Sequence, residues 1–179
     1  YVDGTFGAGG YSRVVLEAGR CAVWGIDRDP EAVAGAAPLV EEFSGRLTVI
    51  AGCFGHMESL LADHGVTRID GVALDVGVSS MQIDTPDRGF SFRHDGPLDM
   101  RMAKSGSSAA DIVNSTDEGD LATLIFTLGE ERRSRRIARA IVDARRQGPI
   151  TRTGELAAIV RRVVRPAKDG LDPATRTFQ

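Results

Sequence analysis

The chain has 179 residues, of which 42% are hydrophobic and 26% charged, and its formal net charge is −3. This length suits one α/β domain, or one domain with a small insertion. No apolar run reaches the length of a membrane span and no signal peptide is visible, so the expected location is the cytoplasm. Cys21 and Cys53 lie in apolar, strand-like segments without metal-ligand spacing, which predicts reduced core residues and no metal site.

The charge is unevenly divided along the chain. Residues 1–103 carry 8 Lys and Arg against 15 Asp and Glu, a net charge of −7, whereas residues 104–179 carry 14 against 10, a net charge of +4. A basic second part on an acidic first part predicts a polyanionic partner for the later segment. A solvated helical face would explain the same excess of basic residues.

A glycine-rich loop follows the first predicted strand, which ends at Asp3, and a helix is predicted from about Ser12. Glycine stands at positions 4, 7, 9 and 10, where it lets backbone N–H groups approach a ligand closely, and the helix start adds unpaired donors. Dinucleotide-binding loops use Gly-x-Gly-x-x-Gly, whereas position 12 here is serine. The spacing therefore favours S-adenosylmethionine over NAD, with a simple tight turn as the alternative.

Two acids follow the second predicted strand, which covers residues 22–26. Asp27 stands at the carboxyl end of this strand, the edge at which open α/β sheets bind ligands, and lies 24 residues after Asp3. Asp29 is followed by Pro30 and Glu31, which is typical of a helix N-cap with proline at the first helical position. Asp27 is therefore the candidate for the ribose hydroxyls, and Asp29 is predicted to be structural.

Strands and helices alternate up to about residue 82. The pattern predicts a helix over 30–43, a strand over 47–51, a helix over 56–64 and a strand over 71–75. This alternation predicts a doubly wound parallel sheet.

The pattern changes in the second part of the chain. Residues 82–107 form a Gly-, Pro- and Asp-rich segment without apolar periodicity, and a loop of this length is usually functional. Amphipathic helices are predicted after it, over 120–128, 130–146 and 155–164. We therefore expect a cofactor-binding α/β domain over 1–83, and a substrate loop with a small helical module over 84–179.

Several long motifs occur in order along the whole chain: Asp3-Gly-Thr-Phe-Gly-x-Gly-Gly-x-Ser12, Gly25-Ile-Asp27-Arg-Asp29, Leu74-Asp75-Val-Gly77-Val-Ser79-Ser80-x-Gln82, Arg88-Gly-Phe-Ser-Phe92, Gly96-Pro-Leu-Asp-Met-Arg-Met102, Gly129-Glu-Glu-Arg132 and Thr175-Arg-Thr-Phe-Gln179. Together they resemble the bacterial small-subunit ribosomal RNA cytosine-N4 methyltransferase family, the RsmH or MraW type. The resemblance implies a Rossmann-like class I methyltransferase sheet with an inserted helical domain. It also implies methylation of the exocyclic amine of a cytosine in the decoding region.

The resemblance further implies a set of S-adenosylmethionine-binding residues: Gly9, Gly10, Tyr11, Asp27, Phe54, Asp75 and Gln82. Position 11 is usually histidine in the family and is tyrosine here. A backbone contact would survive this change, whereas a role specific to imidazole would not. From the residues alone, Phe54 is more typical of a core side chain than of a stacking platform, and the resemblance reverses this interpretation by placing it against the adenine.

The chemistry of such a reaction requires mainly in-line positioning and hydrogen-bond acceptors for the amino protons, because the cytosine amine is a poor nucleophile. Asp75 is the candidate catalytic acceptor, although it could equally serve the cofactor. Ser79 and Ser80 are further candidates, with turn residues as the alternative interpretation.

The target base must leave its stack to reach the methyl group, which requires an aromatic or apolar pocket. The 88–102 segment intersperses aromatic and apolar side chains with arginines, a combination suited to holding RNA: Arg88, Phe90, Phe92, Arg93, Met100 and Arg101. The alternative is a loop that two phenylalanines anchor and whose arginines are solvated. A second arginine cluster follows Gly129 and offers a track for an RNA backbone: Arg132, Arg133, Arg135, Arg136, Arg139, Arg145 and Arg146.

The family sequences continue beyond Gln179 with further sheet strands, and this chain begins without Met, so a truncated product is expected. The expected partner is small-subunit ribosomal RNA or the small ribosomal subunit. Two rival function classes are an NAD(P)-dependent oxidoreductase, which the glycine spacing disfavours, and a non-catalytic RNA-binding module.

Overall fold

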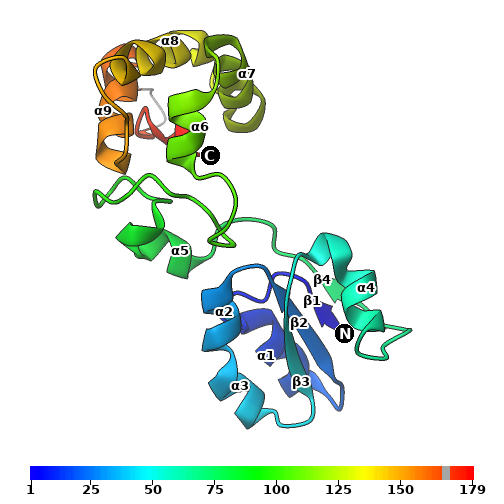
Figure 1. Cartoon of the computed structure of the whole chain (residues 1–179). Coiled ribbons are helices and arrows are strands. Elements are labelled where there is room, and N and C mark those ends of the chain that lie inside the picture. The colour runs from blue at the N-terminus through cyan, green and yellow to red at the C-terminus, as the bar shows by residue number, and fades with distance from the viewer. Residues whose placement is uncertain (167–169) are drawn as a thin grey trace. The chain divides into compact units, whose positions relative to one another are not determined.

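The computed structural model describes residues 1–166 and 170–179 and divides them into two compact units (Figure 1). The first unit comprises Tyr1–Ser79 with Met102–Lys104, and the second comprises Ser80–Arg101 with Ser105–Gln179. The first long segment thus ends at Ser79, and residues 102–104, which the sequence-based division assigned to the later part, belong to the first unit. The predicted domain boundary at 83 and 84 stays a prediction.

The first unit contains a parallel four-stranded sheet in the order β3-β2-β1-β4. Its strands are β1 (Val2–Asp3), β2 (Val23–Asp27), β3 (Leu47–Ala51) and β4 (Val72–Ala73). The predicted α/β class with a parallel sheet is confirmed, and β3 has the predicted bounds. Strand β4 is shorter than the predicted 71–75 and lies at an edge of the sheet.

Helices cover both faces of this sheet (Figure 1). On one face, α1 (Gly10–Ala18) and α3 (Ala37–Glu42) contribute Leu16 and Leu39 to an apolar cluster with strand residues. On the other face, α4 (Met57–Ala62) contributes Leu61 to a cluster with Val2 and Ile26. Strand residues alternate between the two clusters, as expected for a doubly wound sheet buried on both sides.

The helix predicted over 30–43 is in fact two short helices, α2 (Pro30–Gly35) and α3. Pro38 explains the break, because it has no N–H group to donate to the carbonyl of Ala34. The helix predicted over 56–64 is likewise shorter, with a 3₁₀ turn η1 (Phe54–His56) before α4. Cys21 and Cys53 are free thiols, and both are half-buried rather than core residues.

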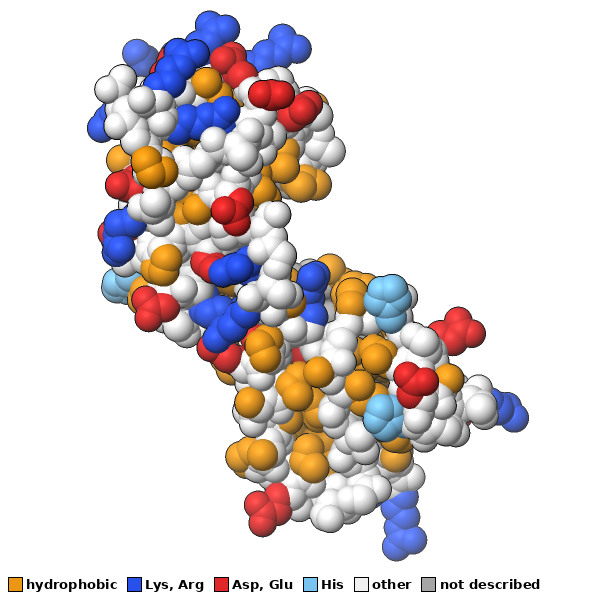
Figure 2. All heavy atoms as spheres, in the orientation of Figure 1, with side chains coloured by type: hydrophobic (Ala, Val, Ile, Leu, Met, Phe, Trp, Pro, Cys, Tyr) orange, Lys and Arg blue, Asp and Glu red, His pale blue; other side chains and the backbone are white. Residues whose placement is uncertain are grey.

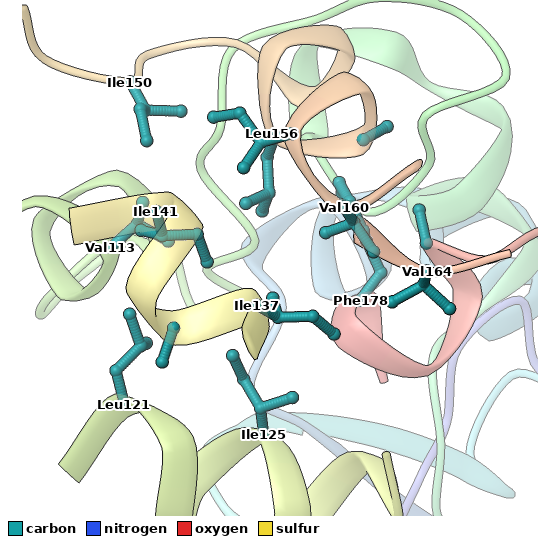
Figure 3. Close-up of a cluster of buried hydrophobic side chains, with 14 of the residues drawn as sticks. Val113, Leu121, Ile125, Ile137, Ile141, Ile150, Leu156, Val160, Val164 and Phe178 are labelled. Carbon is teal, nitrogen blue, oxygen red and sulfur yellow. The ribbon is translucent and has the colours of Figure 1, made fainter. Parts of the chain in front are cut away.

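The second unit is helical. Its elements are α5 (Ser80–Asp84), the 3₁₀ turn η2 (Pro86–Arg88), α6 (Ala109–Ser115), α7 (Glu118–Gly129), α8 (Ser134–Arg145), α9 (Thr153–Val163) and α10 (Thr175–Phe178). Its core lies between α7, α8 and α9, where side chains such as Ile125, Ile137 and Val160 point toward one another (Figure 3).

Helix α6 is absent from the sequence-based prediction. It begins with a capping box, in which the Ser108 hydroxyl accepts from the Asp111 N–H and the Asp111 carboxylate accepts from the Ser108 N–H. Helix α8 begins at Ser134 rather than at Glu130, because α7 runs through Gly129 and Glu130 adopts a left-handed conformation with φ of 52°.

Candidate functional site

The glycine loop is tied to the start of helix α1 by Asp3, the last residue of β1. The buried Asp3 carboxylate accepts hydrogen bonds from the Ser12 hydroxyl at 2.8 Å and the Ser12 N–H at 3.2 Å. Its other oxygen accepts from the N–H of Thr5 at 3.4 Å. Asp3 is not among the predicted site residues, although an acid directly before a glycine loop is a visible signal in the sequence. Asp3 therefore organises the loop rather than facing a ligand.

Two backbone donors at the start of α1 are left without an acceptor. The N-cap residue Gly9 has φ of 79° and provides no side-chain cap. Within the part of the chain that the structure describes, the N–H groups of Gly10 and Tyr11 donate to no protein atom. A Cβ atom added to Gly10 would meet no atom within 4 Å, so the space beside it is open. Two free N–H groups at a helix N-terminus fit a carboxylate, such as that of a methionine moiety.

Asp27 is the last residue of β2 and connects the second strand to the glycine loop. One carboxylate oxygen accepts from the Gly7 N–H at 2.7 Å, and the other accepts from the Asp29 N–H at 2.8 Å. A carboxylate has about four acceptor positions, so the half-buried Asp27 can hold the loop and still accept hydroxyl donors. Its position at the strand end is as expected, and its contact with a ribose stays a prediction.

Asp29 is the N-cap of helix α2, as the sequence predicted. Its buried carboxylate accepts from the Glu31 N–H at 3.0 Å, and Pro30 occupies the first helical position. The two neighbouring acids therefore differ in surroundings, since Asp27 is only half-buried at the ligand edge.

We expect Asp29→Ala to lower the free energy of unfolding by about 1 kcal/mol, because the helix loses its cap. Cofactor affinity should change little. Urea denaturation and a calorimetric titration with S-adenosylmethionine measure the two effects. A larger affinity loss for Asp29→Ala than for Asp27→Ala would reverse the assignment of the two acids.

The order of the strands places a ligand crevice between β1 and β4. From β1 the chain adds β2 and β3 on one side of the sheet and then crosses to add β4 on the other side of β1. The order in which strands are added therefore reverses next to β1. Ligands bind outside the carboxyl ends of the strands at such a switch point. The loops after β1 and β4 meet here, because the Asp75 N–H donates to the Thr5 hydroxyl at 2.7 Å. Thr5 is a site residue that the sequence analysis missed.

Tyr11 and Asp75 lie next to each other at this crevice. The Tyr11 hydroxyl donates to the Asp75 carboxylate at 3.4 Å, across 64 positions of sequence. Both side chains are exposed, Tyr11 at 54%. The structure thus brings together the glycine loop, Tyr11 and Asp75, three features that the sequence analysis assigned to one site.

Phe54 and Gln82, the two other predicted cofactor-binding residues, belong to different units. Phe54 is half-buried in η1, directly after β3, and a Cβ atom on Gly4 would lie 3.1 Å from its Cβ atom. Phe54 therefore adjoins the beginning of the glycine loop. Gln82 is buried in the second unit. The predicted cofactor contacts of both residues stay predictions.

Comparison with known proteins identifies the family. The family model described as the MraW methylase family matches residues 1–179. The chain belongs to the MraW methylase family. It is 65% identical over 178 residues to "Ribosomal RNA small subunit methyltransferase H" of Rhodospirillum centenum, covering 99% of this chain and 54% of that relative. It is 63% identical to the protein of the same name from Paramagnetospirillum magneticum, covering 100% of this chain and 56% of that relative.

Family membership confirms the expected fold class, in which the parallel sheet is that of a Rossmann-like methyltransferase. The chain spans about half the length of the curated relatives it matches.

Most of the predicted RNA-facing residues of the 88–102 segment serve to anchor it. Arg88 is 5% exposed and donates to the Arg101 carbonyl at 3.1 Å. The Arg101 guanidinium contacts both Asp99 oxygens at 2.6–3.1 Å, which lowers the pKa of the Asp99 carboxyl below its usual value. These contacts support the alternative interpretation of an anchored loop for Arg88 and Arg101.

The remaining residues of that segment divide between core and surface. The Phe92 ring lies 4.8 Å from that of Phe178, and Met100 packs against the helical core. The Phe90 ring lies 5.9 Å from the Arg88 guanidinium and is half-buried. Arg93 is exposed, so it is the arginine of this segment best placed to meet RNA.

We expect Arg88→Ala to lower the free energy of unfolding of the second unit by about 2 kcal/mol, because it removes a buried charged donor. Arg93→Ala should leave stability unchanged within about 0.5 kcal/mol, as for an exposed side chain. Urea denaturation followed by circular dichroism measures both. Equal stability of the two variants would show that the Arg88 contacts contribute nothing to the free energy of unfolding. Arg88 would then again be a candidate RNA-binding residue.

The described residues include no group of three or more His, Cys, Asp or Glu side chains placed to hold a metal ion. No described helix combines the length and apolar character needed to cross a membrane.

Proposed function

We propose that this chain forms the cofactor-binding and RNA-contacting part of an S-adenosylmethionine-dependent methyltransferase. Its substrate would be N4 of a cytosine in the decoding region of small-subunit ribosomal RNA, in the cytoplasm. The observation that carries the proposal is the pair of free N–H groups at Gly10 and Tyr11, beside Asp75 at the switch point of the sheet. Family membership and the names of the relatives support the same activity.

The residues present fit this cofactor. The Gly10 and Tyr11 amides suit its carboxylate, and Asp27 suits its ribose hydroxyls. The proposed contacts with Gly10 and Tyr11 would both be made by backbone N–H groups, so tyrosine in place of the usual histidine would not remove them. Phe54 adjoins the loop and is proposed to lie against the adenine.

Bound S-adenosylmethionine supplies an electrophilic methyl group. With the cofactor bound, transfer of this methyl group from sulfur to the cytosine nitrogen would leave S-adenosylhomocysteine, and the nitrogen would lose a proton. Asp75 is the proposed acceptor of that proton, since its exposed carboxylate follows β4 at the crevice. The Tyr11 hydroxyl and the Thr5 contact would keep Asp75 in place. The remaining rate acceleration would come from orientation of the amine in line with the methyl group.

Two measurements test the proposal. A calorimetric titration of this chain should show binding of S-adenosylhomocysteine and none of NADH, and the reverse result would support an oxidoreductase. Methyl transfer from labelled cofactor to small ribosomal subunits is then measured with this chain and, in parallel, with the Rhodospirillum centenum relative. Digestion of the RNA should yield N4-methylcytidine. A methyl group on another atom would contradict the cytosine-N4 assignment while leaving the family unaffected.

A further inference from the structure

A basic groove lies in the second unit, between one face of helix α7 and the beginning of α8. It has a volume of about 700 Å³, and its lining includes Phe126, Arg132, Arg133, Arg135, Arg136 and Arg139. Figure 2 shows Lys and Arg side chains gathered over this end of the second unit, around α8. Helix α8 presents Ile137 and Ile141 to the core, whereas its residues Arg135, Arg136 and Arg139 are exposed. Arg132 and Arg133 directly precede the helix and are exposed too.

Four of these arginines have no partner within the described residues. Arg139 pairs with Glu118 at 3.3 Å, whereas the side chains of Arg132, Arg133, Arg135 and Arg136 form no ion pair or hydrogen bond in residues 1–166 and 170–179.

Several arginines elsewhere in the chain are paired with an acid. Arg13 pairs with Glu42, Arg152 with Asp95 and Arg161 with Asp172. Other exposed arginines, such as Arg20 and Arg68, lie outside the groove.

The groove lining also holds an acid, Glu118, but it pairs with Arg139. The four guanidinium groups that are unpaired in the described part of the chain therefore leave an excess of positive charge at the groove.

An exposed aromatic ring lies in the same groove. Phe126 is 57% exposed, whereas Leu121 and Ile125 of the same helix are buried in the core. A flat ring bordered by guanidinium groups is suited to stack a nucleobase while the arginines contact the adjoining phosphates. A solvated helical face needs no exposed ring, so Phe126 favours a ligand over that simpler explanation.

We propose that this groove binds single-stranded RNA, with Arg132, Arg133, Arg135 and Arg136 on phosphates and Phe126 stacked on a base. The inference rests on the proposed function, because an RNA substrate supplies the polyanion. It moves the main RNA contact from the 88–102 segment, where Arg88 and Arg101 are engaged within the unit, to helices α7 and α8.

The experiment measures the affinity of this chain for a fluorescein-labelled, mixed-sequence, single-stranded RNA by fluorescence anisotropy across a salt series. The groove variant carries Arg132→Gln, Arg133→Gln, Arg135→Gln and Arg136→Gln. Glutamine keeps high helix propensity, so the fold should persist, and circular dichroism checks it. The matched control removes the same charge from exposed arginines outside the groove: Arg20→Gln, Arg68→Gln, Arg162→Gln and Arg165→Gln.

The groove variant should bind RNA at least about tenfold more weakly, and its salt dependence should flatten by about 0.7 in log–log slope for each phosphate that an arginine no longer neutralises. The control should retain most of the affinity and slope. Phe126→Ala should lose about tenfold in affinity with an unchanged slope, because stacking releases no counterions. Phe126→Trp should restore binding.

Equal losses in the groove variant and the control would overturn the proposal, as would a wild-type chain that binds no RNA. Binding of a poly-glutamate peptide with equal strength and no dependence on Phe126 would instead assign the groove to an acidic protein partner. A parallel titration with S-adenosylmethionine distinguishes a failure of the RNA-binding groove from a failure of the proposed methyltransferase function. If the chain binds the cofactor but the groove substitutions do not change its RNA affinity, only the RNA-binding role of the groove is refuted. If the chain does not bind the cofactor, the proposed function is refuted.

Discussion

Replacing Asp27 by alanine is expected to weaken S-adenosylmethionine binding by roughly 1–3 kcal/mol, which is about 5- to 150-fold. The variant loses the carboxylate proposed to accept the ribose hydroxyls. It also loses the acceptor that holds the Gly7 N–H at 2.7 Å, so the glycine loop is less well ordered before the ligand arrives. Calorimetric titration of the wild-type chain and the variant measures the difference.

Two further variants separate these contributions. Asp27→Asn keeps one carbonyl oxygen for the loop and removes the charge, so an affinity between wild type and Asp27→Ala would assign part of the effect to the carboxylate itself. Asp29→Ala is the matched control, because it removes a neighbouring acid that caps a helix. If Asp27→Ala binds the cofactor as tightly as wild type, Asp27 serves only the loop and the ribose is held elsewhere.

Local sequence patterns sufficed for the features that depend on neighbouring residues. Strand β3 and the cap at Asp29 follow from β-branched residues and from an acid-proline-acid pattern, both of which act within a few positions. The break at Pro38 and the capping box at Ser108 were also local, and their signals were present in the sequence. At both places another local signal competes, since the apolar residues around Pro38 have helical spacing and Ser108 directly follows a Gly-, Pro- and Asp-rich segment.

Contacts between distant positions could not be predicted in this way. The hydrogen bond between Tyr11 and Asp75 depends on β4 pairing with β1, and no local pattern states which strands are neighbours. The family resemblance supplied these site residues, and the structure supplied the reason they meet. The burial of Arg88 was equally hidden, since an arginine between loop residues has the same local pattern whether it is solvated or internal.

The glycine at the end of α7 illustrates the same limit. A glycine directly after a predicted helix, as Gly129 is after residues 120–128, is typical of a helix stop in a left-handed conformation. In the structure the left-handed residue is Glu130, and Gly129 is the last residue of the helix. A Cβ atom on Gly129 would lie 2.0 Å from the backbone oxygen of Arg176, which is part of α10. Glycine is therefore required by a close approach of two backbones far apart in sequence.

Gly129→Ala is accordingly expected to lower the free energy of unfolding of the helical unit by about 3 kcal/mol, the upper part of the usual range for overpacking. The alanine Cβ atom is fixed to the backbone of α7 and would clash with a backbone oxygen of α10, so no side-chain rotation can relieve the clash. Either α7 or α10 has to shift. Urea denaturation followed by the helical circular dichroism signal measures the loss.

Gly119→Ala is the control, because it makes the same substitution in the same helix at a position where a Cβ atom would meet nothing within 4 Å. It should be neutral or stabilise the unit by at most about 1 kcal/mol, since alanine is the better helix former. The free energies of unfolding of the two variants should therefore differ by about 3 kcal/mol or more. A Gly129→Ala chain as stable as wild type would mean that α10 moves away from α7 without cost, and that the packing of residues 175–178 contributes little to the helical unit.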